Sequence, residues 1–238
     1  MAHNQCTRRQ MLQTGCSAAA AIMLAGCASP SGPPALAGGS GVGEEKENEQ
    51  VTPGEDLMRE HGALGRILLI YQVCQRRLQG GQNLPEGLLA GQAMLIRRFV
   101  EDYHERNEEQ YVFPVLEKAA QAELVRTLLA QHQAGRVMTD HILASAQVGC
   151  QGPARQQAID AIGQFLAMYF PHMFREDTIA FPAFQKALPL EQYRRLGEAL
   201  EDREQQVLGK EGFEHAVEQV AAAEKTLGIY ELAQFTPR

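Results

Sequence analysis

An internal repeat constrains this chain more than any other feature of its sequence. Residues 104–114 and 172–182 align without a gap. Each copy has a histidine, a glutamate four residues later and a closing Phe-Pro pair; the paired residues are His104 with Glu108 and His172 with Glu176. Residues four apart lie on one face of a helix, so each pair forms a chelate. The repeat therefore predicts two similar half-sites that face each other about a pseudo-twofold axis.

The apolar residues recur at spacings of three and four, which predicts helices throughout the folded part of the chain. Gly, Pro and short polar connections separate four long patterns, near 55–79, 85–112, 121–147 and 154–180. Pro114 marks a kink or restart after the second helix, and the fourth helix contains Pro171 and meets Pro182. The predicted fold is all-α: an up-down-up-down four-helix bundle over 55–188, with further helices near 190–207 and 213–227 in a C-terminal extension, 189–238.

The first and third predicted helices each add one histidine, His61 and His132. With the repeat they make six predicted ligands, too many for one tetrahedral zinc ion. Six ligands suit two ions, each held by two histidines and sharing both glutamates as bridges. Two divalent cations would nearly balance two glutamates and a bridging hydroxide. Imidazole and carboxylate suit iron, manganese or zinc.

The ordered set of a histidine, a His-x-x-x-Glu, a histidine and a second His-x-x-x-Glu, with Phe-Pro after each pair, resembles the hemerythrin-like, or HHE cation-binding, domain. The resemblance covers about 57–188. It implies a four-helix bundle with a non-heme di-iron centre, iron being expected before manganese or zinc, and with the ligands His61, His104, Glu108, His132, His172 and Glu176.

This chain departs from the oxygen-carrying members of that family at two positions. Arg136 stands where they have a second histidine in the third helix, and Asp177 competes with Glu176 because they use a His-x-x-x-x-Asp spacing. The internal repeat favours Glu176. Glu105 and Glu109 flank the motif; solvated or supporting roles are expected, although Glu105 could reach the second ion.

The absent fifth histidine argues against reversible oxygen carriage. The resemblance then implies a centre that binds oxygen, nitric oxide or peroxide, with or without redox turnover, and that could use a protein redox partner. Whether the chain is an enzyme stays open. An iron-binding or sensing module without catalysis is the alternative, and a structural bundle with incidental histidines is the third reading.

Composition narrows the range of partners. The chain has 29 acidic and 22 basic residues and a formal net charge of −7. Nucleic-acid-binding proteins need a basic surface, so nucleic acid is not an expected partner. The five cysteines show no CxxC spacing typical of zinc or redox sites.

The first residues read as an export signal rather than as part of the fold. Residues 1–27 contain Arg8-Arg9, similar to a twin-arginine signal, then a short apolar run and Leu24-Ala25-Gly26-Cys27, similar to a lipobox. The run is too short to span a bilayer. Residues 28–54, rich in Pro, Gly, Ser and Glu, read as a flexible tether. We expect an exported, periplasmic or otherwise extracytoplasmic protein, anchored to the membrane by a lipid on Cys27.

Overall fold

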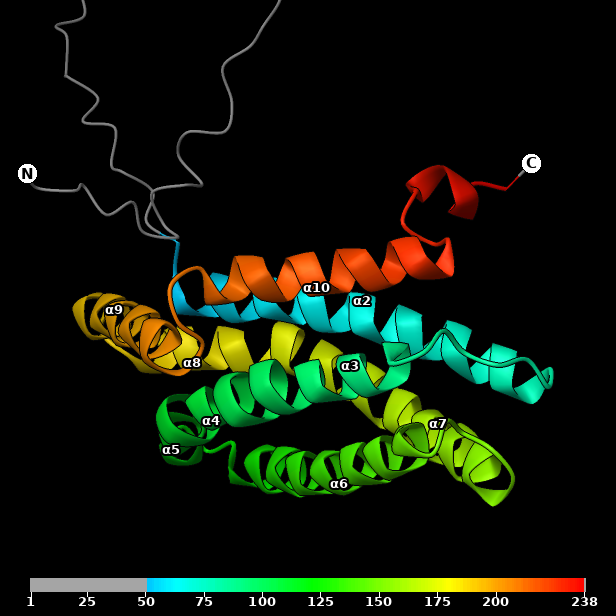
Figure 1. Cartoon of the computed structure of the whole chain (residues 1–238). Coiled ribbons are helices and arrows are strands. Elements are labelled where there is room, and N and C mark those ends of the chain that lie inside the picture. The colour runs from blue at the N-terminus through cyan, green and yellow to red at the C-terminus, as the bar shows by residue number, and fades with distance from the viewer. Residues whose placement is uncertain (1–50, 238) are drawn as a thin grey trace, which may run out of the picture. The chain divides into compact units, whose positions relative to one another are not determined.

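A computed structural model describes residues 51–237, and the predicted signal and most of the predicted tether lie outside them. The described part contains helices and no strand, which confirms the all-α prediction. Four helical rods form the bundle, and two α-helices and a short 3-10 helix follow (Figure 1). The first and third rods are α2 (Pro53–Gln79) and α6 (Ala122–Gln147), and the extension holds α9 (Leu190–Val207), α10 (Gly212–Leu227) and the short 3-10 helix η4 (Leu232–Phe235).

The second and fourth rods are composite. The second is built of α3 (Leu88–Leu95), η1 (Ile96–His104), α4 (Glu105–Asn107), η2 (Glu108–Val112) and α5 (Phe113–Lys118). The fourth is built of α7 (Pro153–Arg175), η3 (Glu176–Ala180) and α8 (Phe181–Ala187). The segments η1, η2 and η3 are π-helical, with a wider turn than the α-helix.

Both composite rods continue through a proline. Helix α5 follows the predicted end near 112 and has Pro114 in its first turn, in agreement with the predicted restart, whereas α8 continues the fourth rod past its predicted end near 180. Pro114 and Pro182 lack the N–H of a normal helical turn, and their rings crowd the carbonyl four residues back. In each rod a five-residue π-helical segment, η2 or η3, directly precedes the Phe-Pro pair. We interpret the wider turn as the way in which each rod passes its proline and remains helical.

The start of α2 is fixed by a capping box. The Thr52 hydroxyl accepts a hydrogen bond from the backbone N–H of Glu55, and the Glu55 carboxylate accepts one from the backbone N–H of Thr52. Pro53 occupies the first turn, where its missing N–H costs nothing. The helix therefore begins two residues before the expected position at 55.

The bundle core is divided into two apolar parts. The larger cluster contains residues such as Ile67, Phe99 and Phe165, and the smaller one contains residues such as Leu57 and Phe184. On each of the four rods the residues between these two clusters are polar and buried; they include His61, His104, Glu108, His132, His172 and Glu176. A polar layer thus crosses the bundle between two apolar clusters.

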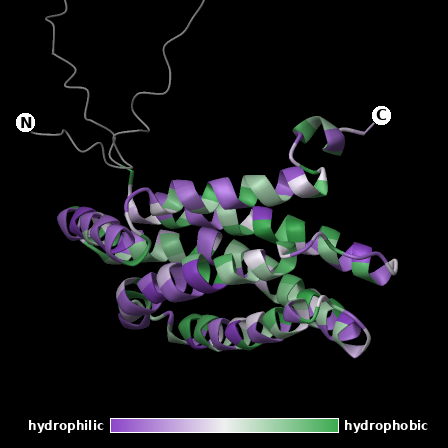
Figure 2. Cartoon of the chain, viewed as in Figure 1, coloured by the Kyte–Doolittle hydropathy of each residue, from purple (hydrophilic) through white to green (hydrophobic). Residues whose placement is uncertain are grey.

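The C-terminal extension packs on the first rod. Helix α10 lies along α2 (Figure 1) and contributes buried residues such as Val220 to the larger cluster. Arg66 of α2 donates two hydrogen bonds to Glu224 of α10, at 2.9 and 2.6 Å. Hydrophilic and hydrophobic residues both occur along α10 (Figure 2), as expected for a helix with one covered face. Among the described residues, no helix has the length and apolar character needed to cross a membrane.

Candidate metal centre

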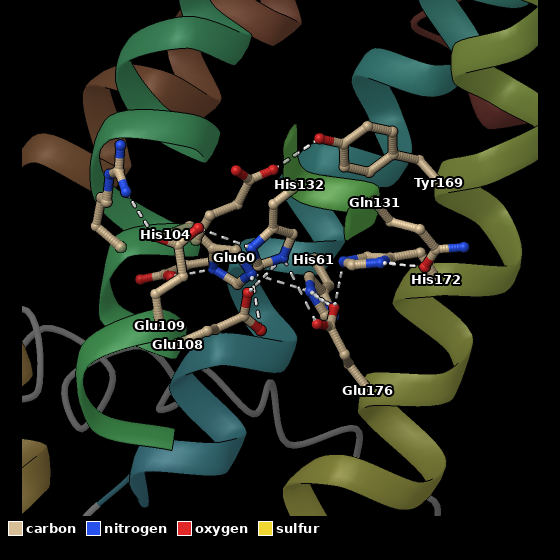
Figure 3. A network of polar contacts seen from close by, with 12 residues as sticks. Glu60, His61, His104, Glu108, Glu109, Gln131, His132, Tyr169, His172 and Glu176 are labelled. Carbon is tan, nitrogen blue, oxygen red and sulfur yellow. Dashed lines mark hydrogen bonds and ion pairs between the residues drawn. The ribbon is translucent and has the colours of Figure 1, made fainter. Parts of the chain in front are cut away.

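The six side chains predicted as ligands lie together in the polar layer, and each is at most 3% exposed. They come from all four rods and point toward one another (Figure 3). Within this set the donor atoms form two compact groups, each with all its atoms within 4.8 Å of one another. The first group is His61, His104 and Glu108, and the second is His132, His172 and Glu176. We call His61 and His104 the first histidine pair, and His132 and His172 the second.

Each glutamate reaches histidines of both pairs. Oε1 of Glu108 lies 3.6 Å from Nε2 of His104, and its Oε2 lies 3.5 Å from Nε2 of His132. Oε2 of Glu176 lies 3.1 Å from Nε2 of His172 and 3.4 Å from Nε2 of His61. Two carboxylates placed in this way between two histidine pairs can bridge two cations.

Several donor atoms at the centre have no hydrogen-bond partner. Both carboxylate oxygens of Glu108, both of Glu176 and Nε2 of His132 are buried and make no hydrogen bond. Buried polar atoms are nearly always satisfied, so five such atoms in one polar layer need an explanation. Nε2 of His61 and Nε2 of His104 also lie only 3.0 Å apart. Divalent cations would satisfy all these lone pairs, so the residues present fit a metal site.

The environment shifts the proton affinities of these groups in opposite directions. Burial, together with the nearby Glu176, raises the pKa of Glu108 well above its usual value. Burial also raises the pKa of Glu176, but His172 and His61 outweigh it and hold that pKa well below its usual value. Burial lowers the pKa of His61, yet its hydrogen bond to Asp177 and the nearby charge of Glu176 raise it to about 9. Cations would compete with protons for these atoms.

The other nitrogen of each histidine is held by a side chain from a neighbouring rod. Nδ1 lies 2.7 Å from Asp177 in His61, 2.7 Å from Glu60 in His104, 3.1 Å from Glu109 in His132 and 2.9 Å from Gln131 in His172. An Nδ1–H donated to an oxygen fixes the tautomer and leaves the Nε2 lone pair for a metal. The four bonds join neighbouring rods in turn: α2 to η1, η2 to α6, α6 to α7, and η3 back to α2. We call this closed ring of bonds the histidine belt.

The sequence of this chain matches the Hemerythrin HHE cation binding domain family over residues 52–184. The chain belongs to this family. It is also 43% identical over 233 residues to an uncharacterized protein of Mycobacterium bovis and to uncharacterized proteins of two Mycobacterium tuberculosis strains. Each alignment covers 97% of this chain and 91% of the relative. No solved structure matches the chain.

In this hemerythrin-family bundle the two consecutive acids of the fourth rod have different positions. Glu176 is fully buried and faces the centre, whereas the side chain of Asp177 is 30% exposed and contacts the outer nitrogen of His61. Asp177 thus lies behind a histidine, on the side away from the centre. Glu176, which the internal repeat favoured as the ligand, is thus the acid that faces the centre.

Arg136, at the position of the fifth histidine in oxygen-carrying hemerythrins, contacts two carboxylates. Its Nη2 lies 2.7 Å from Oε2 of Glu105 and 2.8 Å from Oε1 of Glu109. Glu105 also accepts a 2.7 Å hydrogen bond from the Tyr169 hydroxyl. Both glutamates that flank the motif are therefore engaged by Arg136, and Glu109 additionally holds His132.

The phenylalanines of the two Phe-Pro pairs cover histidine rings. Phe113 stacks on His132 with ring centroids 5.4 Å apart, and Phe181 stacks on His61 at the same separation. Each copy of the repeat thus supplies a His-Glu pair to the centre and an aromatic ring that stacks on a histidine of another rod.

The acceptors Glu60 and Gln131 were not identified from the sequence. A positional signal does exist: each Nδ1 acceptor is the direct neighbour of a ligand on its own rod. The adjacent pairs are Glu60-His61, Glu108-Glu109, Gln131-His132 and Glu176-Asp177. One residue of each pair faces the centre, and the other supports a histidine on a neighbouring rod.

The remaining histidines of the described region lie outside the centre. His141 is exposed on α6, and His215 of α10 is exposed and lies 3.8 Å from Glu218. The two cysteines of the described region, Cys74 and Cys150, are buried and unbridged.

Proposed function

We propose that this chain binds two iron ions, with His61, His104, Glu108, His132, His172 and Glu176 as ligands. The observation that carries the proposal is the convergence of buried lone-pair atoms, on Glu108, Glu176 and His132, that have no hydrogen-bond partner. Two ions are favoured over one because each glutamate reaches histidines of both pairs. The first histidine pair would hold one ion and the second pair the other, and both glutamates would bridge.

The proposed ligand of the loaded centre is oxygen, nitric oxide or peroxide. When bound, iron would supply the redox chemistry that these small molecules require. This chain's own residues exclude water and fix the histidine rings, through the histidine belt and the stacking of Phe113 and Phe181. Arg136 argues against reversible oxygen carriage, because it stands in place of the fifth histidine and its guanidinium contacts Glu105 and Glu109 instead.

The alternative is an iron-binding or sensing module without catalysis. The burial of all six side chains favours this function, because a sequestered site suits retention of an ion. Steady-state consumption of oxygen, nitric oxide or peroxide separates the two. Sustained turnover supports the redox function, with a protein redox partner as the electron source, whereas stoichiometric binding alone supports the module.

Metal analysis of the purified protein tests the site. We expect two iron ions per wild-type chain, and manganese or zinc in their place would correct the identity of the metal. The variants His104→Ala and His172→Ala should each lose metal. His141→Ala and His215→Ala are matched controls, because both histidines are exposed, and they should retain it. Unchanged metal content in the first two variants would contradict the proposed site and would support the interpretation of a structural bundle with incidental histidines.

We further propose export and lipid anchoring through Cys27. The support is the sequence of residues 1–27, which lie outside the described structure. Mass spectrometry of the protein from a bacterial membrane fraction should show a lipid on Cys27 and no residue before it. Cys27→Ser should move the protein to the soluble fraction. Unlipidated wild-type protein would contradict the anchor.

A further inference from the structure

The histidine belt is not symmetric in charge, although the repeat that builds it is nearly symmetric. Both Nδ1 acceptors of the first histidine pair are carboxylates: Asp177 behind His61 and Glu60 behind His104. For the second pair, the acceptor behind His172 is the neutral amide of Gln131. Within the second pair, only His132 has a carboxylate as its Nδ1 acceptor, that of Glu109.

The carboxylate of Glu109 is itself shared with two arginines. Nη2 of Arg136 lies 2.8 Å from its Oε1, and Nη1 of Arg106 lies 2.6 Å from its Oε2. Two guanidinium groups compensate the negative charge that would otherwise act on His132. The second histidine pair is therefore supported by one amide and one compensated carboxylate.

More negative charge gathers near the first pair. Carboxylate oxygens of Asp56, Glu60 and Glu204 lie within 4.8 Å of one another, and Glu60 is the residue that holds His104. Arg59 lies 3.7 Å from Asp56, so part of this charge is compensated. The first pair still has two carboxylates in direct contact with its outer nitrogens, where the second has one.

A carboxylate behind an imidazole raises the basicity of the ligating nitrogen and tightens its bond to a metal. We propose that the two metal positions differ in affinity: the ion at His61 and His104 binds first and tightly, and the ion at His132 and His172 is the exchangeable one. This inference rests on the proposed two-metal function. It assigns the outer residues Asp177 and Gln131 as the groups that set the difference.

The test is an anaerobic titration of the metal-free protein with Co²⁺, followed by the absorbance of the bound ion. Wild type should bind two ions in two resolved steps that differ in affinity by about 10- to 100-fold, the usual effect of an outer hydrogen-bond partner. Circular dichroism of each variant checks that it is folded.

Two variants assign the steps. Gln131→Glu places a carboxylate behind His172 and should tighten the weaker step, so that the two steps merge. Gln133→Glu adds the same charge at an exposed position of the same helix and is the matched control; it should leave both steps unchanged. Asp177→Asn should weaken the tighter step, by about 10- to 100-fold.

The outcomes separate this inference from the function on which it rests. Two steps of equal affinity in wild type would overturn the inference and leave the two-metal function intact. The same holds if Gln131→Glu tightens the stronger step, or if it acts no differently from Gln133→Glu. Wild-type protein that binds no Co²⁺ and no iron would overturn the proposed function itself.

Discussion

The ring of His61 contacts Asp177 through one nitrogen and Glu176 through the other. Nδ1 lies 2.7 Å from Oδ1 of Asp177, and Nε2 lies 3.4 Å from Oε2 of Glu176. Two consecutive acids of one rod thus contact opposite edges of the same imidazole. The first faces the proposed ions, and the second orients the ring.

This relationship predicts different effects of two isosteric substitutions. Glu176→Gln removes a charged inner oxygen and should lower the bound metal below two ions per chain. Asp177→Asn keeps the shape of the outer acceptor, so the variant should still take up two ions at saturating metal, although with lower affinity at the first pair. Metal content after gel filtration from excess iron measures both. The reverse result would make Asp177 the ligand.

The ion pairs of Arg136 predict that its removal lowers the stability of the protein. Arg136→Ala removes a hydrogen bond to Glu109 and leaves the buried Glu105 without its neighbouring cation. It should lower the free energy of unfolding by about 1.5–3 kcal/mol, as for lost hydrogen bonds to charged groups. Arg106→Ala is the matched control, because Arg106 pairs only with Glu109 and its side chain is 49% exposed; its effect should stay below about 1 kcal/mol. Urea unfolding measures both, and equal losses would contradict the prediction.

The close packing of Tyr169 against Gly135 predicts that a larger residue at this position lowers the stability of the protein. A Cβ at this position would overlap the Tyr169 hydroxyl and lie 2.8 Å from its Cζ, so Gly135→Ala should destabilise the protein by about 1–3 kcal/mol. A Cβ at Gly91 would meet nothing within 4 Å, and this exposed glycine lies in helix α3. Gly91→Ala should therefore stabilise the protein by about 0.5–1 kcal/mol. Thermal unfolding checks the opposite signs, and destabilisation by both would refute the packing argument.

The thiol of Cys74 should be unreactive in the folded protein. Burial raises its pKa to about 12, so almost no thiolate exists at pH 8, and the thiolate is the reactive form. Burial also raises the pKa of Cys150. Peptide mass spectrometry after iodoacetamide at pH 8 should find both residues unmodified without denaturant and alkylated in guanidinium chloride. Rapid alkylation of Cys74 in the folded protein would contradict its burial.

Metal removal should lower stability without unfolding the chain. An ion that binds only the folded state adds to the free energy of unfolding, so a chelator should lower the melting temperature. The two apolar clusters remain, so the far-ultraviolet circular dichroism at 25 °C should not change. The variant His132→Ala, tested with and without chelator, should show a smaller shift. An identical shift would mean that the chelator acts elsewhere.

Much of the fold was predictable because it depends on local pattern. The apolar spacing identified all four rods and both outer helices, and Gly80 ended the first rod as expected. The restart at Pro114 was predicted, but the continuation of the fourth rod past 180 was not, because helix rules treat a proline as a stop. In the structure a π-helical segment precedes each of Pro114 and Pro182 and the rods are continuous. Spacing alone does not reveal a widened turn.

The inner face of the site was predictable, and its outer face was not. The repeat identified His104, Glu108, His172 and Glu176 because a four-residue spacing places two donors on one helical face. The acceptors Glu60 and Gln131 lie on different rods from the histidines that they hold. Their roles depend on the rotation of one helix against the next, which the periodicity of a single helix does not encode.

The histidine belt has a mechanical consequence for assembly of the centre. Its four bonds link each rod to both of its neighbours, so the four rods are connected in a closed ring. Rotating any one rod would break two of these bonds at once, so the four contacts together hold the angular setting of all four rods. Protein contacts would thereby orient the ligands for incoming ions, without refolding of the chain around them.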